Sequence, residues 1–475
     1  MTTLPTIIQG GMGVAVSNWK LARAVSMRGQ LGVVSGTALD TVLIRRLQDG
    51  DIDGDVRRAM EKFPIAGVAD RVLERYFIPG GRESGQPYRL LPMYRQHVSR
   101  ERQAVTVLAN FVEVFLAKEG HEGMVGINLL TKVQMPTLPS LYGAMLAGVD
   151  CVLMGAGIPR EIPGALDNLS MHRPAALRFE VEGLPSGESL HLEFDPSEFA
   201  GDVSVPLKRP AFYPIVSAIS LAATLARKAN GRVDGFVVEG PTAGGHNAPP
   251  RGEARFNGRG EPLYGERDVV DIEKMKSLGL PFWLAGGAGS PARLQEALDA
   301  GANGIQVGTL FAFCEESGFT GDIKSEVLSH AQRDEVDVYT DPLASPTGYP
   351  FKVVKWSGDS STQVRERKCD LGYLRNAFRR ADGRVDYRCA AEPVEDYVRK
   401  GGLEADTVGR KCLCNALTAN IGQAQLRGEN VEEPTLVTSG DDLTAIAGFL
   451  QGRSSYTAGE VIDYLLEPAY AGSMQ

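Results

Sequence analysis

One histidine stands in a setting that favours proton chemistry. The stretch "GFVVEGPTAGGHNAPPRG" at 235–252 runs from an apolar strand pattern into a loop of glycines and prolines that carries His246. An imidazole at the C-terminal end of a strand can face a bound ligand, and its usual pKa near neutrality suits acid–base catalysis. A loop histidine is more often a surface or structural residue, but of the chain's six histidines only His246 has these neighbours. We interpret His246 as a catalytic acid or base.

Two glycine-rich turns further along the chain could hold a phosphate group. The stretch "PFWLAGGAGSPARLQEALDAGANGIQVGTLF" at 281–311 places Gly286 and Gly287 after one apolar run and Gly308 and Thr309 after the next. Bare backbone N–H groups in such turns, beside the start of a helix, attract anions. In a single loop of this kind, the glycines would more simply be explained by the need for a tight turn. Because two consecutive loops have the pattern, a phosphate site is favoured.

Four of the six cysteines lie in the C-terminal third of the chain, at Cys369, Cys389, Cys412 and Cys414. In a cytosolic protein four thiols within one segment raise the possibility of structural zinc or a [4Fe–4S] cluster. Their spacing is not that of two C-x₂-C pairs, and free cysteines are commonly small buried residues. Metal ligation and simple burial therefore both stay open. Cys151 and Cys314 fall in strand and helix patterns and are expected in the core.

The elements that must position these groups alternate between apolar strand-like runs and helical patterns, as in βαβ units. Eight runs occur, and most end in glycine or another small residue. Eight is the number of strands that closes a (β/α)₈ or TIM barrel, whose sites lie at the C-terminal ends of the strands. The runs are 6–11, 31–36, 124–130, 151–157, 213–219, 235–240, 281–287 and 304–309.

A doubly wound open sheet is the competing α/β fold. It requires a G-x-G-x-x-G turn after the first strand and an acidic residue at the end of the second. The stretch "GGMGVA" lacks that spacing and no acid follows "LGVVSG", so the barrel is preferred. We predict a barrel over 1–330, with insertions at about 46–105 and at 173–210, the second a β-hairpin. Residues 331–475 are predicted to form a C-terminal extension that is mostly helical and carries the cysteine cluster.

Charge and composition limit the partners. A net charge of -9 argues against nucleic acid, because duplex binding needs a positive surface. The first residues lack a secretory pattern, and no apolar window is long enough for a membrane span, so a cytoplasmic protein is expected. Residues 365–388 hold eight Arg or Lys against four Asp or Glu. That segment could dock an acidic acyl carrier protein, although a solvated charged face is the commoner case.

These motifs together resemble the nitronate monooxygenase family, also called 2-nitropropane dioxygenase-like, whose members are FMN-dependent barrels. The stretch from "PTIIQGGMG" to "LGVVSG" resembles the family's first two strands, and "GINLL" resembles its third. The stretch "AGGH" resembles its histidine motif, and "LAGGAGSPARLQEALDAGANGIQVGTLF" resembles its flavin-phosphate region. The likeness covers most of residues 5–320.

By this resemblance the chain is an FMN oxidoreductase whose catalytic histidine is His246. The histidine would act at a carbon beside an electron-withdrawing group, while the flavin accepts or delivers electrons. Gly244 and Gly245 would let the backbone pass close to the flavin ring. The resemblance also implies two further sets of contacts: Gly11, Met12, Gly13 and Asn128 to the flavin, and Gly286, Gly287, Gly308 and Thr309 to its phosphate.

The length of the chain and its C-terminal extension look more like the flavin enoyl reductases of polyunsaturated fatty acid and polyketide synthases. That branch implies NAD(P)H as a co-substrate and an enoyl thioester, borne by an acyl carrier protein, as the substrate. An iron–sulfur cluster would instead point to an acyl-thioester dehydrogenase or isomerase. A flavin-free barrel, with lyase or isomerase activity on a phosphorylated metabolite, is the hypothesis from another class.

Overall fold

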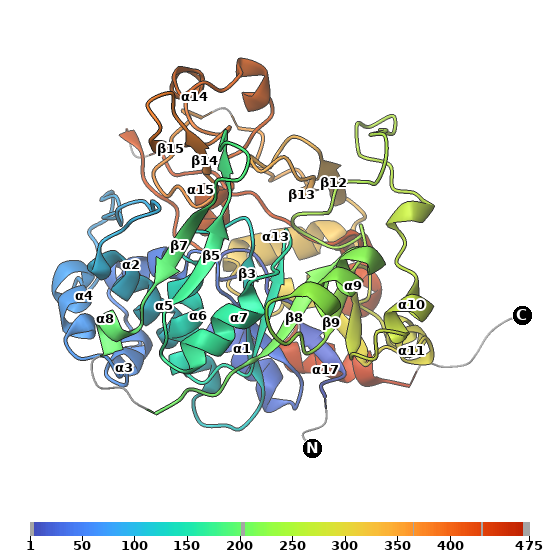
Figure 1. Ribbon diagram of the computed structural model, residues 1–475. Helices are drawn as coiled ribbons and strands as arrows, with labels where there is room; N and C mark the ends of the chain where they lie inside the picture. Colours follow the sequence, from blue (N-terminus) through green and yellow to red (C-terminus); the bar gives the residue numbers. More distant parts are fainter. Residues whose placement is uncertain (1–3, 201–204, 364, 429–430, 469–475) are drawn as a thin grey trace, which may run out of the picture.

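Short parallel strands form the centre of the molecule. The computed structural model describes residues 4–200, 205–363, 365–428 and 431–468, and eight strands of this part form one sheet (Figure 1). Seven of the eight predicted runs contain one of these strands and the run at 213–219 overlaps β8, so the prediction of eight strands is confirmed. They are β1 (Ile7–Gln9), β2 (Gly32–Ser35), β3 (Val125–Leu130), β4 (Cys151–Gly155), β8 (Ala211–Val216), β9 (Phe236–Glu239), β10 (Phe282–Ala285) and β11 (Gly304–Val307).

The sheet closes on itself where β1 meets β2. Strand β1 pairs with β11 along its length, but it meets β2 only at a single bridge between Ile8 and Leu31. The side chain of Gln9 completes this seam: the Val33 N–H donates to its Oε1 (3.0 Å), and its Nε2 donates to the Val33 carbonyl (3.2 Å). A closed parallel sheet of eight strands confirms the predicted (β/α)₈ barrel.

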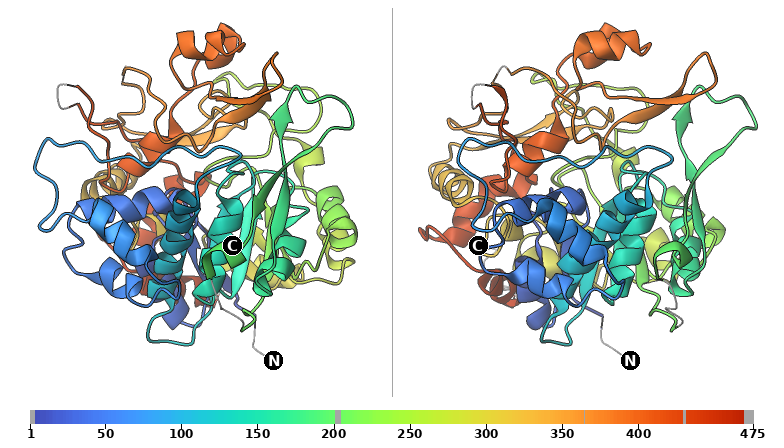
Figure 2. Two further views of the ribbon diagram at one scale, coloured as in Figure 1. Left: turned by 60° about the vertical axis from the view of Figure 1, so that its left-hand side comes forward. Right: turned by 90° about the vertical axis from the view of Figure 1, so that its left-hand side faces the viewer.

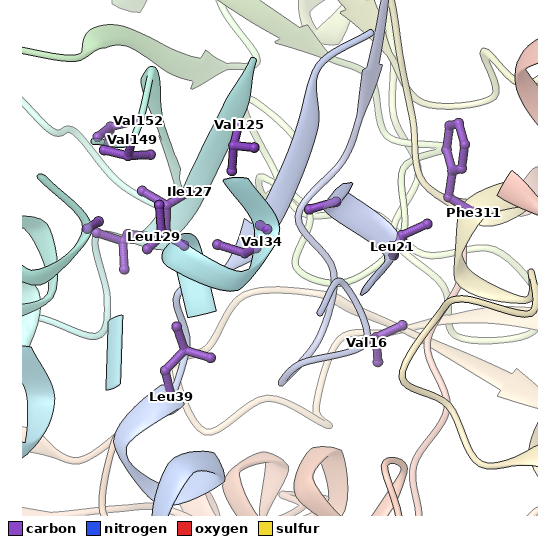
Figure 3. Close-up of a cluster of buried hydrophobic side chains, with 14 of the residues drawn as sticks. Val16, Leu21, Val34, Leu39, Val125, Ile127, Leu129, Val149, Val152 and Phe311 are labelled. Atoms are coloured by element: carbon purple, nitrogen blue, oxygen red, sulfur yellow. The ribbon is translucent and has the colours of Figure 1, made fainter. Parts of the chain in front are cut away.

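Side chains on the two faces of the strands fill two separate apolar layers. Ile8 and Val33 point into the barrel and pack there with Trp283. Their chain neighbours Ile7 and Val34 point outward to the helices. Figure 3 shows the outer layer, where Val34, Val125, Ile127 and Val152 on the strands gather with Leu21 and Phe311. This alternation is the period of two that strands impose. Cys151 and Cys314 are fully buried, as predicted.

Helices cover the outside of the barrel. α5, the longest of them, packs against both α1 and α6. Local signals set the helix boundaries: the Ser290 side chain caps α11 and Pro291 opens it, and Thr457 with Glu460 forms a capping box at α17. The outer helices are α1 (Trp19–Met27), α5 (Arg100–Lys118), α6 (Thr137–Leu146), α7 (Ile162–Ser170), α9 (Ile219–Lys228), α10 (Ile272–Lys276), α11 (Pro291–Asp299) and α17 (Ala458–Leu466).

The last of these helices comes from the end of the described chain. α17 packs against α1 and α11, the position between the first and seventh barrel helices (Figure 1). The chain between α12 (Thr309–Ala312) and α17 is therefore inserted before the helix that completes the wall. The predicted division at residue 330 falls inside α13 (Gly321–Gln332). The region after it is better described as an insertion into the last βα unit than as an appendage.

Two smaller insertions occupy the predicted segments. Helices α2 (Leu39–Gln48), α3 (Asp55–Met60) and α4 (Val68–Tyr76) lie between β2 and α5. The predicted β-hairpin is present, because β5 (Ala175–Phe179) pairs antiparallel with β7 (Leu190–Phe194). Helix α8 (Ser197–Ala200) follows it, and residues 201–204 of this predicted insertion lie outside the described residues. Strand β6 (Val181–Glu182) leaves the hairpin to pair with β14 of the large insertion.

The region after residue 332 is less helical than predicted. Two hairpins stand at its centre, and Figure 2 shows this orange part of the chain lying across one end of the barrel. Alternating apolar and polar residues with an Asp382-Gly383 turn explain the second hairpin. The strands are β12 (Asp337–Asp341), β13 (Phe351–Lys355), β14 (Asn376–Arg379) and β15 (Val385–Arg388). The helices are α14 (Val394–Arg399), α15 (Leu413–Ala419) and α16 (Ile446–Leu450), with 3₁₀ turns η2 (Glu404–Thr407) and η4 (Asp441–Ala445). A further 3₁₀ turn, η1 (Glu266–Asp268), lies earlier in the chain, between β9 and α10. Within the described ranges, every helix is too short or too polar to cross a bilayer.

Replacing Gln9 by Met tests the seam. Methionine has a similar size but cannot bond to Val33, so a buried N–H and a buried carbonyl lose their partners. We expect the free energy of unfolding to fall by about 2–4 kcal/mol in denaturant titrations. Gln295→Met on the exposed face of α11 is the matched control and is expected to change stability by less than about 0.5 kcal/mol. Equal effects of the two substitutions would show that the seam does not depend on Gln9.

Candidate active site

One large cavity lies where the barrel strands end. Its volume is about 370 Å³, and residues at the ends of all eight strands and in the loops that follow them form it. The large insertion contributes the remaining wall, with residues 349–351, 373–374, 413–420 and 438–442 among those that contain lining side chains. Every residue that the sequence analysis assigns to catalysis or cofactor binding lines this cavity: Gly11, Met12, Gly13, Asn128, Gly244, Gly245, His246, Gly286, Gly287, Gly308 and Thr309.

The loop after β1 is shaped by a buried hydroxyl. Ser17 Oγ accepts a hydrogen bond from the Met12 N–H (2.9 Å) and donates to the Gly10 carbonyl (2.9 Å). Gln9 Nε2 also donates to Ser17 Oγ (2.9 Å), which joins this loop to the seam of the barrel. Gly11 must be glycine here, because a Cβ would lie 2.3 Å from the Cβ of Asn128. The predicted pair of Gly11 and Asn128 therefore does meet in space.

Two buried amides on opposite strands have free acceptors. The Oδ1 of Asn128 on β3 and the Oε1 of Gln306 on β11 have no hydrogen-bond partner within the described residues. Both side chains line the cavity. Buried polar atoms normally find partners, so an unpaired pair of acceptors at one cavity indicates that a ligand supplies the donors. The sequence analysis proposed Asn128 only from the family resemblance and missed Gln306.

The loop that carries His246 is held by the large insertion. Lys352 N–H donates to the Gly245 carbonyl (2.9 Å), and Asn247 N–H donates to the Pro350 carbonyl (2.9 Å). On the other side, Gly245 N–H donates to Thr438 Oγ1 (2.8 Å). Gly244 lies so close to the 439–440 backbone that a Cβ would be 2.7 Å from the nearest atom. These contacts fix the loop between β13 and the segment 438–442.

The ring of His246 faces the cavity and is partly buried. Its Nε2 is 2.7 Å from Ser345 Oγ, and Phe351 packs edge-on against it with ring centroids 4.8 Å apart. Burial lowers the pKa of His246 to about 4. The expectation of a pKa near neutrality is therefore wrong, because the sequence could not show that a distant segment packs against this ring. At neutral pH the imidazole is uncharged and in its basic form.

Glu239, the last residue of β9, is a site residue that the sequence analysis missed. Its side chain lines the cavity and has no hydrogen-bond or ion-pair partner in the described part of the chain. Burial raises the pKa of Glu239 to about 7. The available signal was an acidic residue that closes an otherwise apolar strand in "FVVEG". A carboxyl group in this position can exchange a proton near neutral pH.

The predicted phosphate turns meet a carboxyl group from the insertion. Gly286 and Gly287 have φ values of +92° and +61°, which favour glycine and turn the backbone toward the cavity. The Thr309 hydroxyl donates to the Asp442 carboxylate and accepts from Gly440 N–H (3.2 Å). Burial raises the pKa of Asp442. The turns come together as predicted, but the hydroxyl of Thr309 is already bonded.

Known proteins support the assignment that these motifs suggested. Residues 207–349 match the model of a family described as Nitronate monooxygenase. This region, less than a third of the chain, is similar to the nitronate monooxygenase family. The matched region includes β9, Glu239, the His246 loop, β10, β11 and both phosphate turns. The match confirms the resemblance and indicates an FMN-dependent oxidoreductase.

Solved structures with similar folds have low sequence identity. FabK from Thermotoga maritima is 16% identical and aligns over 98% of this chain and 93% of that chain, with a TM-score of 0.47. Nitroalkane oxidase from Streptomyces ansochromogenes is 13% identical over 97% and 94%, with a TM-score of 0.45. The enoyl reductase domain of MlnA from Bacillus amyloliquefaciens is 12% identical over 97% and 95%, with a TM-score of 0.44. No curated protein matches the sequence. Likenesses of this size say nothing about the reaction of this chain.

The large cavity at the ends of the barrel strands fits FMN. Its volume lies in the range of small-molecule sites. The unpaired acceptors of Asn128 and Gln306 suit the ring N–H of a flavin, and the glycine turns at 286–287 suit its phosphate. The carboxyl group of Asp442 beside Thr309 is the one feature that opposes an anion at this position. The donor set as a whole is therefore compatible with the cofactor.

The four C-terminal cysteines come together at a second, much smaller cavity. Its volume is about 10 Å³. Cys414 also lines the large cavity at the ends of the barrel strands, so the two cavities share a wall. As the side chains stand, no three Cys, His, Asp or Glu residues of the described chain are placed to hold a metal ion. The sequence prediction of four cysteines in one cluster is confirmed, whereas their ligation stays a prediction.

The locally basic segment 365–388 is largely engaged within the molecule. Arg379 pairs with Glu188, and Arg388 pairs with Glu182, both on or next to the small hairpin insertion. Arg365 pairs with the buried Glu433. Arg379 and Arg388 join the large insertion to the hairpin insertion, and Arg365 pairs within the large insertion. Only part of the segment is therefore available for an acidic carrier protein.

Replacing Glu239 by Gln tests its environment through the pH dependence of stability. Because the pKa is raised from 4.5 to about 7, the folded state binds this proton more tightly than the unfolded chain. The stability due to this group is complete below pH 4.5 and is lost as the pH rises through 7. We expect the variant to be more stable than the parent at pH 8, by on the order of 2–3 kcal/mol, and nearly equal at pH 5. Denaturant titrations at both values measure this, with the exposed Glu296→Gln as control. A difference that is the same at both pH values would show that Glu239 is not buried as described.

Proposed function

We propose that the chain is an FMN-dependent oxidoreductase in which His246 transfers a proton at a carbon beside an electron-withdrawing group. The observation that carries this proposal is the arrangement of a neutral histidine and two glycine turns around one enclosed cavity at the C-terminal ends of the barrel strands. Barrel enzymes build their active sites at this end. The family match over residues 207–349 supports the same assignment.

The chain's own residues would bind FMN in three groups. Gly11, Met12, Gly13 and Asn128 would contact the flavin ring. Gly286, Gly287, Gly308 and Thr309 would bind its phosphate through backbone N–H groups, and Gly244 and Gly245 would let the His246 loop approach the ring. When bound, FMN would accept or deliver the electrons of the reaction.

His246 would act as the base of the reaction. Its neutral imidazole is the form that removes a proton, and Ser345 fixes the ring through Nε2. In the tautomer that donates from Nε2, the lone pair of Nδ1 is free to take a proton from the substrate carbon. The segment 438–442 and β13 would exclude water from this step, because they close the loop on two sides. A neutral nitroalkane, whose deprotonation gives the nitronate, or another carbon acid is the substrate class that needs these groups.

A second function is favoured by Glu239 and by the apolar wall from the insertion. Reduction of an enoyl thioester needs a proton at the α-carbon, and a carboxyl group with a pKa of about 7 can supply it at neutral pH. Leu374, Leu413 and Leu417 line the cavity on the side of the insertion and suit an acyl chain. NAD(P)H would supply the electrons, and an acyl carrier protein could deliver the substrate.

Two assays separate these functions. The purified protein is tested for nitronate-dependent oxygen uptake and for NAD(P)H-dependent reduction of an enoyl thioester. His246→Ala is expected to slow the chemical step of the true reaction by roughly 10²–10⁴-fold. Glu239→Gln is expected to impair thioester reduction far more than nitronate oxidation. His330→Ala, in the exposed part of α13, is the control and leaves both rates unchanged. An unchanged rate in the His246 variant would end the assignment of this residue.

The position of the phosphate is tested at Asp442. If the phosphate binds at the two glycine turns, Asp442→Asn removes a nearby negative charge and is expected to tighten FMN binding by roughly 3–10-fold at pH 8. Riboflavin, which lacks the phosphate, is expected to bind both proteins equally. Flavin fluorescence titration of the apoprotein measures all four affinities. An equal change for FMN and riboflavin would place the phosphate elsewhere.

A further inference from the structure

Four cysteines that are distant in the sequence converge behind the wall of the large cavity. Cys369 precedes the β14–β15 hairpin, Cys389 follows it, and Cys412 and Cys414 lie at the start of α15. All four line the cavity of about 10 Å³, and they pack together with Ala391. Neither the proposed oxidoreductase chemistry nor the cofactor uses them. Three separate segments of the insertion therefore present their thiols to one point.

A side-chain donor points at one of the sulfur atoms. The Nδ2 of Asn415 donates a hydrogen bond to Cys412 Sγ (3.5 Å). Such donors stabilise a thiolate and gain little from a neutral thiol. Similar N–H groups form the outer shell of thiolate metal sites.

Positive charge lies beside the cysteines. Arg375 lines the small cavity together with all four of them. A guanidinium group beside thiols favours their thiolate form, which is the form that binds a metal ion.

We propose that Cys369, Cys389, Cys412 and Cys414 bind a single zinc ion. Zinc takes four thiolates in a tetrahedral arrangement with Zn–S distances of about 2.3 Å. A cavity of about 10 Å³ holds roughly one water-sized sphere, which suits one ion and is too small for a [4Fe–4S] cluster. No three of the side chains now stand in a metal-binding arrangement, so the thiols must rotate about their Cα–Cβ bonds to close on the ion.

The ion would have a structural role next to the active cavity. Leu413 and Cys414 line both cavities, so the zinc site would anchor the start of α15 against the β14–β15 hairpin. Irregular chain joins these elements, and the ion would add a cross-link among them. Because zinc does not change its oxidation state, this site would add rigidity and no electron transfer.

Metal analysis of the whole protein tests the proposal without any assay of turnover. We expect about one zinc per chain after purification from zinc-supplemented medium, and tetrahedral thiolate absorption bands after exchange with Co²⁺. Cys412→Ser and Cys369→Ser are expected to lower zinc affinity by at least 100-fold. Cys314→Ala, in the buried core, is the control and keeps the metal. Zinc retained in both serine variants, no bound zinc in the parent, or iron with sulfide in its place would each overturn the proposal.

A measurement on the unmodified chain covers the case in which the variants fail to fold. Thiol alkylation with peptide mapping is carried out on the native protein, with zinc and after removal of zinc by a chelator. We expect zinc to protect Cys369, Cys389, Cys412 and Cys414 together, and chelation to expose the four together. Cys151 and Cys314 are buried in the core and are expected to react equally slowly in both samples. Alkylation rates that zinc does not change would reject the site, whether or not the proposed oxidoreductase function holds.

Discussion

The buried amide of Gln9 is the interaction on which the other parts of the site depend. Strand β1 has three residues and touches β2 at one bridge, so backbone pairing alone holds this seam weakly. The side chain of Gln9 bonds to the backbone N–H and to the carbonyl of Val33. These two hydrogen bonds take the place of strand–strand hydrogen bonds that β1 and β2 do not make. The same amide bonds to Ser17, which sets the loop at 10–13. Closure of the barrel and the shape of the loop at 10–13 therefore both depend on the Gln9 side chain. The contact between Gly11 in this loop and Asn128 on β3 depends in turn on that closure and on that loop shape.

The large insertion completes the active cavity that the barrel begins. The barrel supplies the glycine turns, Asn128 and Glu239, but the His246 loop is bonded on both sides to the insertion. The insertion also provides Ser345 and Phe351, which orient the imidazole and cover part of it. Since α17 then returns to the barrel wall between α1 and α11, the insertion is fixed at both ends. This arrangement makes the geometry at His246 depend on the folding of a segment that is distant in the sequence.

The sequence predicted what local patterns determine. Eight apolar runs predicted the barrel strands, the alternation at 175–194 predicted the hairpin, and glycine turns after strands predicted part of the cavity wall. It did not predict features that arise from contacts across the chain. The bond between Thr309 and Asp442, the packing of Phe351 on His246 and the place of α17 all join residues far apart in sequence. The low pKa of His246 belongs to this second group, because desolvation is a property of the assembled cavity and not of the loop. The sequence showed an acidic residue at the end of this strand, Glu239. Only the assembled cavity shows that burial raises its pKa into the range useful for proton transfer.

One physical cause shifts the two ionisable groups of the cavity in opposite directions. Burial disfavours charge, so it lowers the pKa of His246 to about 4 and raises that of Glu239 to about 7. Near neutral pH the cavity thus holds an uncharged base and a carboxyl group close to half protonation. Groups whose environments separate their pKa values in this way can take different roles in acid–base chemistry. The histidine can accept a proton from a carbon acid, and the carboxyl group can return one to a carbanion-like centre. The same walls can therefore serve oxidation or reduction, and the direction depends on which electron donor or acceptor reaches the cavity.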